Sequence, residues 1–91
     1  MPTQTSIDLA KVDTIEKLHA RLKRSLHLPD YYGANLDALY DVLTEGGEER
    51  TLVFRNAADF WHRFPDFTPR LVQMLLNARD ETEGLDIIFH P

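Results

Sequence analysis

The sequence contains no cysteine, only four glycines, and no long uninterrupted apolar run. Without cysteine there is no disulfide framework and no thiolate metal site, so stability depends on aliphatic and aromatic side chains. A membrane-spanning helix needs about 20 apolar residues, whereas the apolar runs here are short, such as Ile87-Ile88-Phe89. The first residues, MPTQTSIDLAK, lack the basic and apolar stretches of a secretory signal. We therefore expect a cytoplasmic protein without membrane contact.

The length of 91 residues leaves room for one hydrophobic core. A chain of this size buries only about 60% of its unfolded surface, which is too little for two stable cores. With 43% hydrophobic and 27% charged residues, the composition is that of an ordinary globular protein. The sequence predicts a single domain over residues 1–91, and we expect it to be a monomer when free.

Positive charge is absent from the middle of the chain. Residues 25–49 contain no lysine or arginine but six carboxylates, at Asp30, Asp37, Asp41, Glu45, Glu48 and Glu49. This segment therefore carries −6, against −5 for the whole chain. Nucleic acid is not expected as a partner, because phosphates are bound by lysine and arginine. A field of one sign attracts basic partners, although a run of acids is also typical of a merely solvated surface.

Hydrophobic periodicity predicts the element order β-α-α-β-α-α-β. Strands are expected at residues 4–9, 51–55 and 85–89, the last covered on both faces because its apolar run is nearly continuous. Helices are expected at residues 14–27, 36–45 and 57–64, and from residue 68 toward Gly84. Strands separated by helices favour an α/β fold: a small three-stranded parallel sheet with right-handed crossovers and about four helices packed around it.

Capping residues predict where the helices begin and end. The expected N-caps are Asp13, Asn35, Asp59 and Thr68, the last with Pro69 in the first helical position. The expected stop signals are Pro29, Gly46-Gly47, Pro65 and Gly84.

Catalytic and metal-binding groups are sparse. The histidines are His19, His27, His62 and His90, and each is expected at the surface or at a boundary. His19 and His27 lie eight residues apart, and no acid or histidine four residues from either completes a metal site. There is neither a G-x-S-x-G motif nor a glycine-rich phosphate loop. We expect no catalysis, no metal and no cofactor, and a small enzyme is the least favoured function.

The helix predicted at residues 36–45 has two different faces. Leu36, Leu39, Tyr40 and Leu43 recur on one face, and Asp37, Asp41, Thr44, Glu45 and Glu48 line the other. Carboxylates four residues apart repel by about 0.2–0.5 kcal/mol per pair, and the helix has no base to offset this. A cationic partner would complete the acidic face, although solubility alone also accounts for it.

Two aromatic residues, Tyr31 and Tyr32, occupy the loop before this helix. Exposed tyrosine is a common anchor of protein interfaces, because it combines a large apolar ring with a polar tip. Tyrosine equally covers the edge of a core, so both roles stay open for this pair.

The segment of residues 28–44, LPDYYGANLDALYDVLT, resembles the motif L-P-x-Y-Y-G-x-N-L-D-A-L-W-D-x-L-T of the barstar family of ribonuclease inhibitors. The first helix and Glu83-Gly84 before the last strand extend the resemblance over nearly the whole chain. It implies a three-stranded parallel sheet surrounded by helices. It also implies a cytoplasmic bacterial protein, not an enzyme, that blocks the active site of a basic ribonuclease with the acidic helix and the preceding loop.

The resemblance also implies particular contact residues. Tyr31 matches a loop tyrosine that packs on the enzyme, and Asp37 and Asp41 match two aspartates that meet its basic groups. Asp41 is the central one, at the position of a substrate phosphate, and Thr44 matches a threonine at the edge of the contact. The expected partner-binding set is Tyr31, Gly33, Asn35, Asp37, Ala38, Asp41, Thr44 and Glu45.

Three positions depart from the family pattern. Tyr40 replaces the tryptophan of the motif on the core-facing side of the helix. Residues 46–49, GGEE, occupy the stretch in which the best-known member has an interface tryptophan, and Arg79 stands where the last helix of the family has an acid. The target is therefore left open, and the alternative partner is a non-nuclease basic protein or toxin.

Overall fold

The computed structural model describes residues 3–45 and 49–91. Its elements are β1 (Thr3–Asp8), α1 (Ile15–Ser25), α2 (Leu36–Leu43), β2 (Arg50–Arg55), α3 (Ala57–Arg63), α4 (Thr68–Glu81) and β3 (Leu85–Phe89). This order confirms the predicted one, and every strand boundary lies within one residue of the expected position. None of the described helices is long and apolar enough to cross a membrane.

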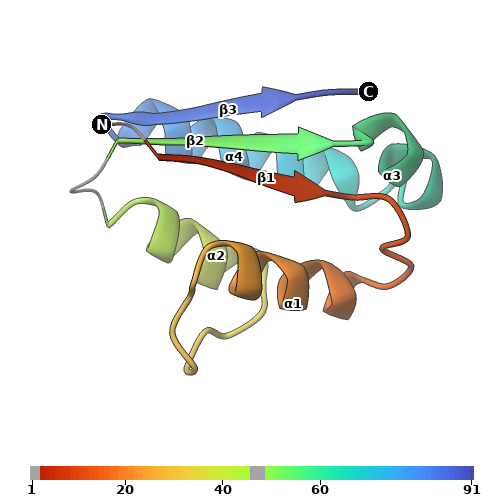
Figure 1. Cartoon of the computed structure of the whole chain (residues 1–91), viewed down its shortest axis with the longest axis horizontal. Coiled ribbons are helices and arrows are strands. Elements are labelled where there is room, and N and C mark those ends of the chain that lie inside the picture. The colour runs from red at the N-terminus through yellow and green to blue at the C-terminus, as the bar shows by residue number, and fades with distance from the viewer. Residues whose placement is uncertain (1–2, 46–48) are drawn as a thin grey trace.

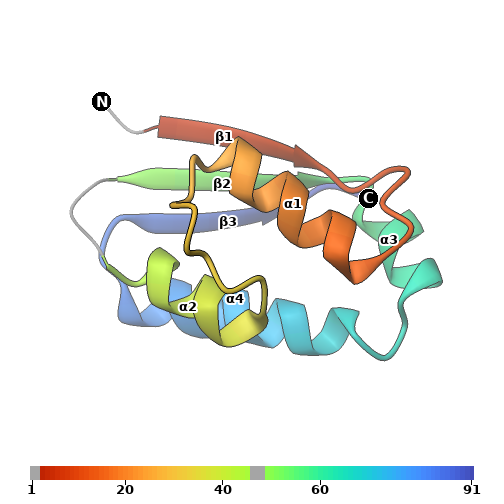
Figure 2. The same ribbon diagram turned by 90° about the horizontal axis from the view of Figure 1, so that it is seen from below.

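The three strands form a parallel sheet in the order β1-β2-β3, which confirms the predicted α/β fold (Figure 1). The register places Thr5, Leu52 and Ile87 in one row and Ser6, Val53 and Ile88 in the next. Because side chains alternate along a strand, these two rows face opposite sides of the sheet. In Figures 1 and 2, α1, α2 and α4 lie on one side, as two right-handed crossovers made in the same direction require.

The expectation that β3 is covered on both faces is wrong. Leu85 and Ile87 are buried, whereas Asp86 is exposed and Ile88 is 39% exposed. Ile88 lies on the open side of the sheet beside Val53, which is in the central strand. The nearly continuous apolar run therefore arises from one isoleucine on the open side and not from a second covering layer.

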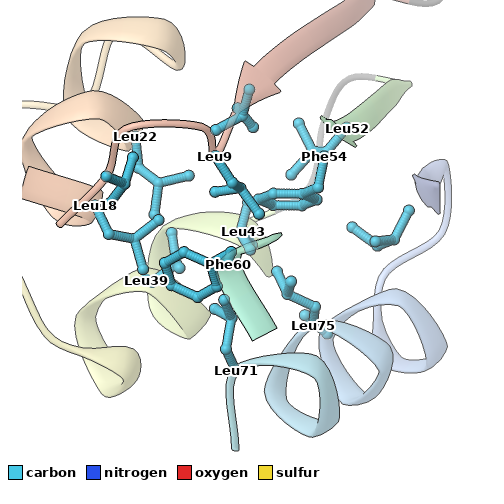
Figure 3. Close-up of a cluster of buried hydrophobic side chains, with 14 of the residues drawn as sticks. Leu9, Leu18, Leu22, Leu39, Leu43, Leu52, Phe54, Phe60, Leu71 and Leu75 are labelled. Carbon is cyan, nitrogen blue, oxygen red and sulfur yellow. The ribbon is translucent and has the colours of Figure 1, made fainter. Parts of the chain in front are cut away.

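The core fills the space between the sheet and the three helices on its covered side (Figure 3). The four helices and the central strand contribute fully or almost fully buried side chains: Leu18 and Leu22 from α1, Leu39 and Leu43 from α2, Leu52 and Phe54 from β2, Phe60 from α3, and Leu71 and Leu75 from α4. Burying one such side chain contributes about 1.5–3 kcal/mol. In a chain without cysteine, this cluster is the main source of stability.

Three of the four expected N-caps are wrong, and two of these three, Asp13 and Asp59, form ion pairs instead. Thr14, not Asp13, caps α1, because its side chain accepts a hydrogen bond of 3.0 Å from the Lys17 amide. Asp13 pairs instead with the Lys17 ammonium at 2.8 Å. Asp59 lies inside α3, where its carboxylate pairs with Arg63 at 2.6 Å. At Asp13 the ion pair four residues along the chain competes with capping for the carboxylate, whereas the N-cap of α3 is Asn56, three residues before Asp59.

The C-terminal end of α1 comes two residues before the predicted one. His27 has a positive φ of 54°, and the Leu28 amide donates to the Lys23 carbonyl at 2.9 Å. This turn satisfies a carbonyl that the helix end would otherwise leave unpaired. The chain thus leaves the helix at Leu26, before Pro29 could stop it.

The ends of α4 also differ from expectation. Thr68 is the first residue of the helix and not its N-cap, which is Phe67. The Thr68 hydroxyl donates to the Phe64 carbonyl at 2.7 Å, because the end of α3 lies directly before this turn. Gly84 has a φ of 88° and lies two residues beyond the C-cap Thr82, so a left-handed glycine does end this region, one position later than predicted.

Candidate partner-binding surface

Helix α2 separates apolar and acidic side chains between its two faces. Leu39 and Leu43 are completely buried, whereas Asp37 and Asp41 are exposed. Tyr40 is partly buried against the core, as predicted for its position. The segment between α1 and α2 projects away from the sheet at the lower edge of Figure 1. The acidic residues and the loop are therefore available on the surface of the helical layer.

The beginning of α2 is fixed by local contacts. Asn35 caps the helix as predicted: its Oδ1 accepts from the Ala38 amide at 2.7 Å, and its Nδ2 donates to the Gly33 carbonyl at 3.2 Å. A Cβ on Gly33 would lie 3.4 Å from the Ala38 Cβ, which is van der Waals contact, so the turn packs against the first turn of the helix. Asp37 follows in the first turn, where the helix dipole favours a carboxylate.

The end of α2 is at Leu43, two residues before the predicted one. Thr44 is the C-cap, and its hydroxyl donates to the Tyr40 carbonyl at 2.8 Å. Glu45 is exposed in a bend just after the helix. The expected stop at Gly46-Gly47, and Glu48 as part of the acidic face, lie outside the described residues.

Arg50 supports α2 from outside the helix, and the sequence pattern did not single it out. Its Nη2 donates to the carbonyls of Val42 and Leu43, at 3.4 and 3.2 Å. Arg50 is the first base after the run of acids, and this position is the one feature of the sequence that could have drawn attention to it. Its contact partners depend on how β2 packs against α2, which the linear sequence does not give.

The two loop tyrosines have different environments. One is exposed, as an interface anchor would be, and the other covers the edge of the core. The Tyr31 side chain is 85% exposed, whereas Tyr32 is partly buried against the core. The Tyr32 hydroxyl lies 2.6 Å from the His19 Nδ1, and its amide donates to the Pro29 carbonyl at 2.9 Å. Tyr32 therefore ties the loop to α1, and Tyr31 is left available to a partner.

His19 is buried, with only 4% of its surface exposed, so its expected surface or boundary position is wrong. Its ring lies 5.7 Å from that of Tyr32, centroid to centroid. Burial lowers the pKa of His19 below its ordinary value of 6.5 and raises the pKa of Tyr32 to about 12. Both groups are thus neutral at physiological pH, and the hydrogen bond joins two uncharged rings.

We expect the free energy of unfolding to fall as the pH is lowered below 6.5. In that range unfolded His19 is protonated while the buried ring is still neutral, so the unfolded state binds more protons. His19→Gln should flatten this slope in urea unfolding between about pH 5 and 7. His62→Gln, at an exposed position of α3, is the control. Equal slopes for His19→Gln and the wild type would exclude His19 as the titrating group.

The acidic groups of α2 are not neutralised within the described residues. Asp37, Asp41 and Glu45 form no ion pair there, and the ion pairs present lie elsewhere. Asp30, in the loop, is 3.8 Å from the Lys23 ammonium, and both side chains are exposed. Such an exposed pair contributes little to stability. The α2 carboxylates thus present uncompensated negative charge to the solvent.

The histidines do not gather into one site. His19 is in α1, His27 follows the same helix, His62 is in α3 and His90 follows β3. Among the residues that the structure describes, no group of three or more histidines and carboxylates is placed to hold a metal ion.

The fold and this surface define a class of small α/β proteins in which a capped acidic helix and an exposed loop tyrosine lie beside each other in the chain. The chain belongs to the barstar family, described as barstar (barnase inhibitor), whose pattern matches residues 3–90. A protein of Bacillus subtilis (strain 168) named "Putative ribonuclease inhibitor YrdF" is 51% identical over 77 residues, which cover 82% of this chain and 84% of that protein. The recognition based on residues 28–44 is thereby confirmed.

Proposed function

We propose that this chain inhibits a basic ribonuclease by covering its active site with α2 and the preceding loop. The observation that carries the proposal is that Asp37 and Asp41 are exposed, and form no ion pair with any residue that the structure describes, on a helix whose opposite face is buried. Membership of the barnase-inhibitor family supports it. The chain would act in the cytoplasm as a monomer, with no catalysis or cofactor of its own.

The proposed contact set is the partner-binding set expected from the sequence, and all of its members except the half-buried Ala38 and Thr44 are exposed. It comprises Tyr31, Gly33, Asn35, Asp37, Ala38, Asp41, Thr44 and Glu45. The Asp41 carboxylate has two acceptor oxygens that suit bidentate pairing with arginine, and such charge-assisted hydrogen bonds are strong where water is excluded. The Thr44 hydroxyl already donates within the helix end, so toward a partner it would act as an acceptor.

Gly33, Asn35 and Ala38 would contribute mainly through shape. The Asn35 amide is used in capping α2, and a Cβ added to Gly33 would contact the Ala38 Cβ. These side chains would protrude little from the turn. A partner could therefore approach Tyr31 and Asp37 from the same direction.

A second candidate partner is a non-nuclease basic protein or toxin. The observation that favours it is Arg79, which is exposed on α4 and pairs only with its neighbour Asp80, at 3.4 Å, among the described residues. If this positive charge faced the partner, it would disfavour a uniformly positive active-site rim. The partner would then carry a compensating acid at that position.

We expect the chain to inhibit RNA cleavage by barnase, the probe ribonuclease, with an association rate that falls as salt rises. The field of the acidic segment reaches about 30 Å at 0.01 M salt but only about 8 Å at 0.15 M, so steering weakens while dissociation changes less. Stopped-flow measurement across this range tests both points. Absence of inhibition of barnase and of other basic ribonucleases would contradict the proposed function, and a salt-independent association rate would contradict steering.

A further inference from the structure

We propose that Arg50 is a positioning residue for the acidic surface. Its guanidinium holds the last turn of α2, and with it Asp41, in the arrangement that a basic partner meets. The inference rests on the proposed function of α2, because only a binding role makes the position of the Asp41 carboxylate matter.

The last four carbonyls of a helix have no partner inside the helix. In α2 they belong to Tyr40, Asp41, Val42 and Leu43. The Thr44 amide donates to the Tyr40 carbonyl at 3.0 Å, and its hydroxyl reaches the Tyr40 and Asp41 carbonyls at 2.8 and 3.4 Å. Arg50 takes the remaining two, of Val42 and Leu43. The C-cap Thr44 and the Arg50 side chain thus satisfy all four of these carbonyls.

Arg50 supplies what α2 lacks. The helix has only eight residues and no base in its last turn. An isolated helix of this length is marginal in water, and a cation at its C-terminal end interacts favourably with the helix dipole. The guanidinium is delocalised, presents its N–H donors in a fixed planar fork and stays charged at any physiological pH. Both contacts come from Nη2, whose two N–H groups can serve two neighbouring carbonyls together.

The other end of Arg50 is fixed in the sheet. Its amide donates to the Gly84 carbonyl at 2.8 Å, and it pairs with Thr3 and Leu85 across the strands. It has the same parity along β2 as Leu52 and Phe54, which lie on the covered side, so its side chain leaves the sheet toward the helices. Arg50 therefore connects the end of the acidic helix to the central strand of the sheet.

The two aspartates of α2 depend differently on this contact. Asp37 lies in the first turn, which Asn35 caps. Asp41 lies in the last turn, whose carbonyls Arg50 and Thr44 satisfy. Loss of the guanidinium should therefore loosen the position of Asp41 while Asp37 keeps its place.

If Arg50 acted only through its charge, its substitution would strengthen the complex with a basic ribonuclease instead of weakening it. Removing a positive charge makes the surface more negative, so a basic ribonuclease should associate faster. Loosening the end of α2 should instead make the complex dissociate faster. The two rate constants, measured separately, distinguish a positioning role from a mere charge effect.

The test compares Arg50→Met with Arg55→Met, with barnase as the probe. Arg55 is exposed at the other end of β2, and its substitution removes the same charge without touching α2. Both variants should associate slightly faster than wild type. Only Arg50→Met should dissociate about 5- to 30-fold faster, equivalent to about 1–2 kcal/mol. Arg50→Lys, which keeps the charge but not the fork, should fall between Arg50→Met and wild type.

Amide hydrogen exchange of the free protein provides a second readout that needs no partner. Arg50→Met should speed exchange of the amides of residues 40–44. The amides that are hydrogen-bonded between the strands of the sheet should keep their wild-type protection. Unchanged exchange in α2, or equal dissociation rates for Arg50→Met and Arg55→Met, would overturn the inference. If wild type fails to bind any basic ribonuclease, the proposed function fails, and the exchange experiment still decides whether Arg50 holds α2.

Discussion

Replacing Asp41 with alanine is expected to weaken the complex with a basic ribonuclease by about 2–5 kcal/mol, which is roughly 30-fold to several thousandfold. The barnase–barstar complex is itself among the systems that define this range, so the magnitude is carried over from the family. The physical reason is that the variant leaves the basic groups of the enzyme buried without their counter-charge. Most of the effect should appear in the dissociation rate, measured by competition with excess unlabelled inhibitor.

The fold should tolerate this change, because Asp41 is exposed and forms no ion pair within the described residues. One like-charge repulsion with Asp37 is also removed. Asp86→Ala is the matched control, since it removes an exposed carboxylate from β3 and should alter only the association rate, and only slightly. Wild-type inhibition by Asp41→Ala would show that the central contact has been assigned to the wrong residue.

Replacing Leu39 with alanine is expected to lower the free energy of unfolding by about 2–5 kcal/mol. Leu39 is completely buried in the cluster that joins α2 to the sheet and to the other helices (Figure 3). The variant loses the transfer free energy of the removed carbons and leaves a cavity that the rigid surroundings fill only in part. Because small domains have about 5–15 kcal/mol in total, this loss is large, and urea unfolding monitored by circular dichroism measures it.

Asp37→Ala, on the same helix, serves as the comparison. Its side chain is exposed, and the loss of a favourable interaction with the helix dipole is offset by relief of the repulsion from Asp41. Its effect on the free energy of unfolding should stay within about 0.5 kcal/mol. Similar losses for Leu39→Ala and Asp37→Ala would mean that α2 is not packed as the structure has it.

The element order, the parallel sheet and the acidic helix could be predicted from the sequence because they depend on short-range patterns. Apolar residues at helical spacing mark α2, and Asn35 sits where a cap must be to accept from the Ala38 amide. Asp37 and Asp41 share a face simply because they are four residues apart on a helix. The family motif added the function that such a face would serve, which spacing alone leaves open.

Local patterns failed where two groups in the same stretch compete for one partner. Asp13 and Thr14 are both good caps, and the Lys17 ammonium draws Asp13 away from the helix end. In β3 the apolar run suggested two covered faces, because hydropathy does not record on which side of a sheet the helices return. Crossover handedness and strand order decide that, and they leave Ile88 on the open side.

The sequence by itself determined the elements, the charge of α2 and the membership of a family, since each is encoded within a few dozen consecutive residues. Only the tertiary structure decided which side chains hold the binding surface in place. His19 meets Tyr32 thirteen residues away, and Arg50 reaches back seven and eight residues to the end of α2. These contacts depend on how helices pack against the sheet and the loop, and packing brings together groups that no spacing along the chain relates.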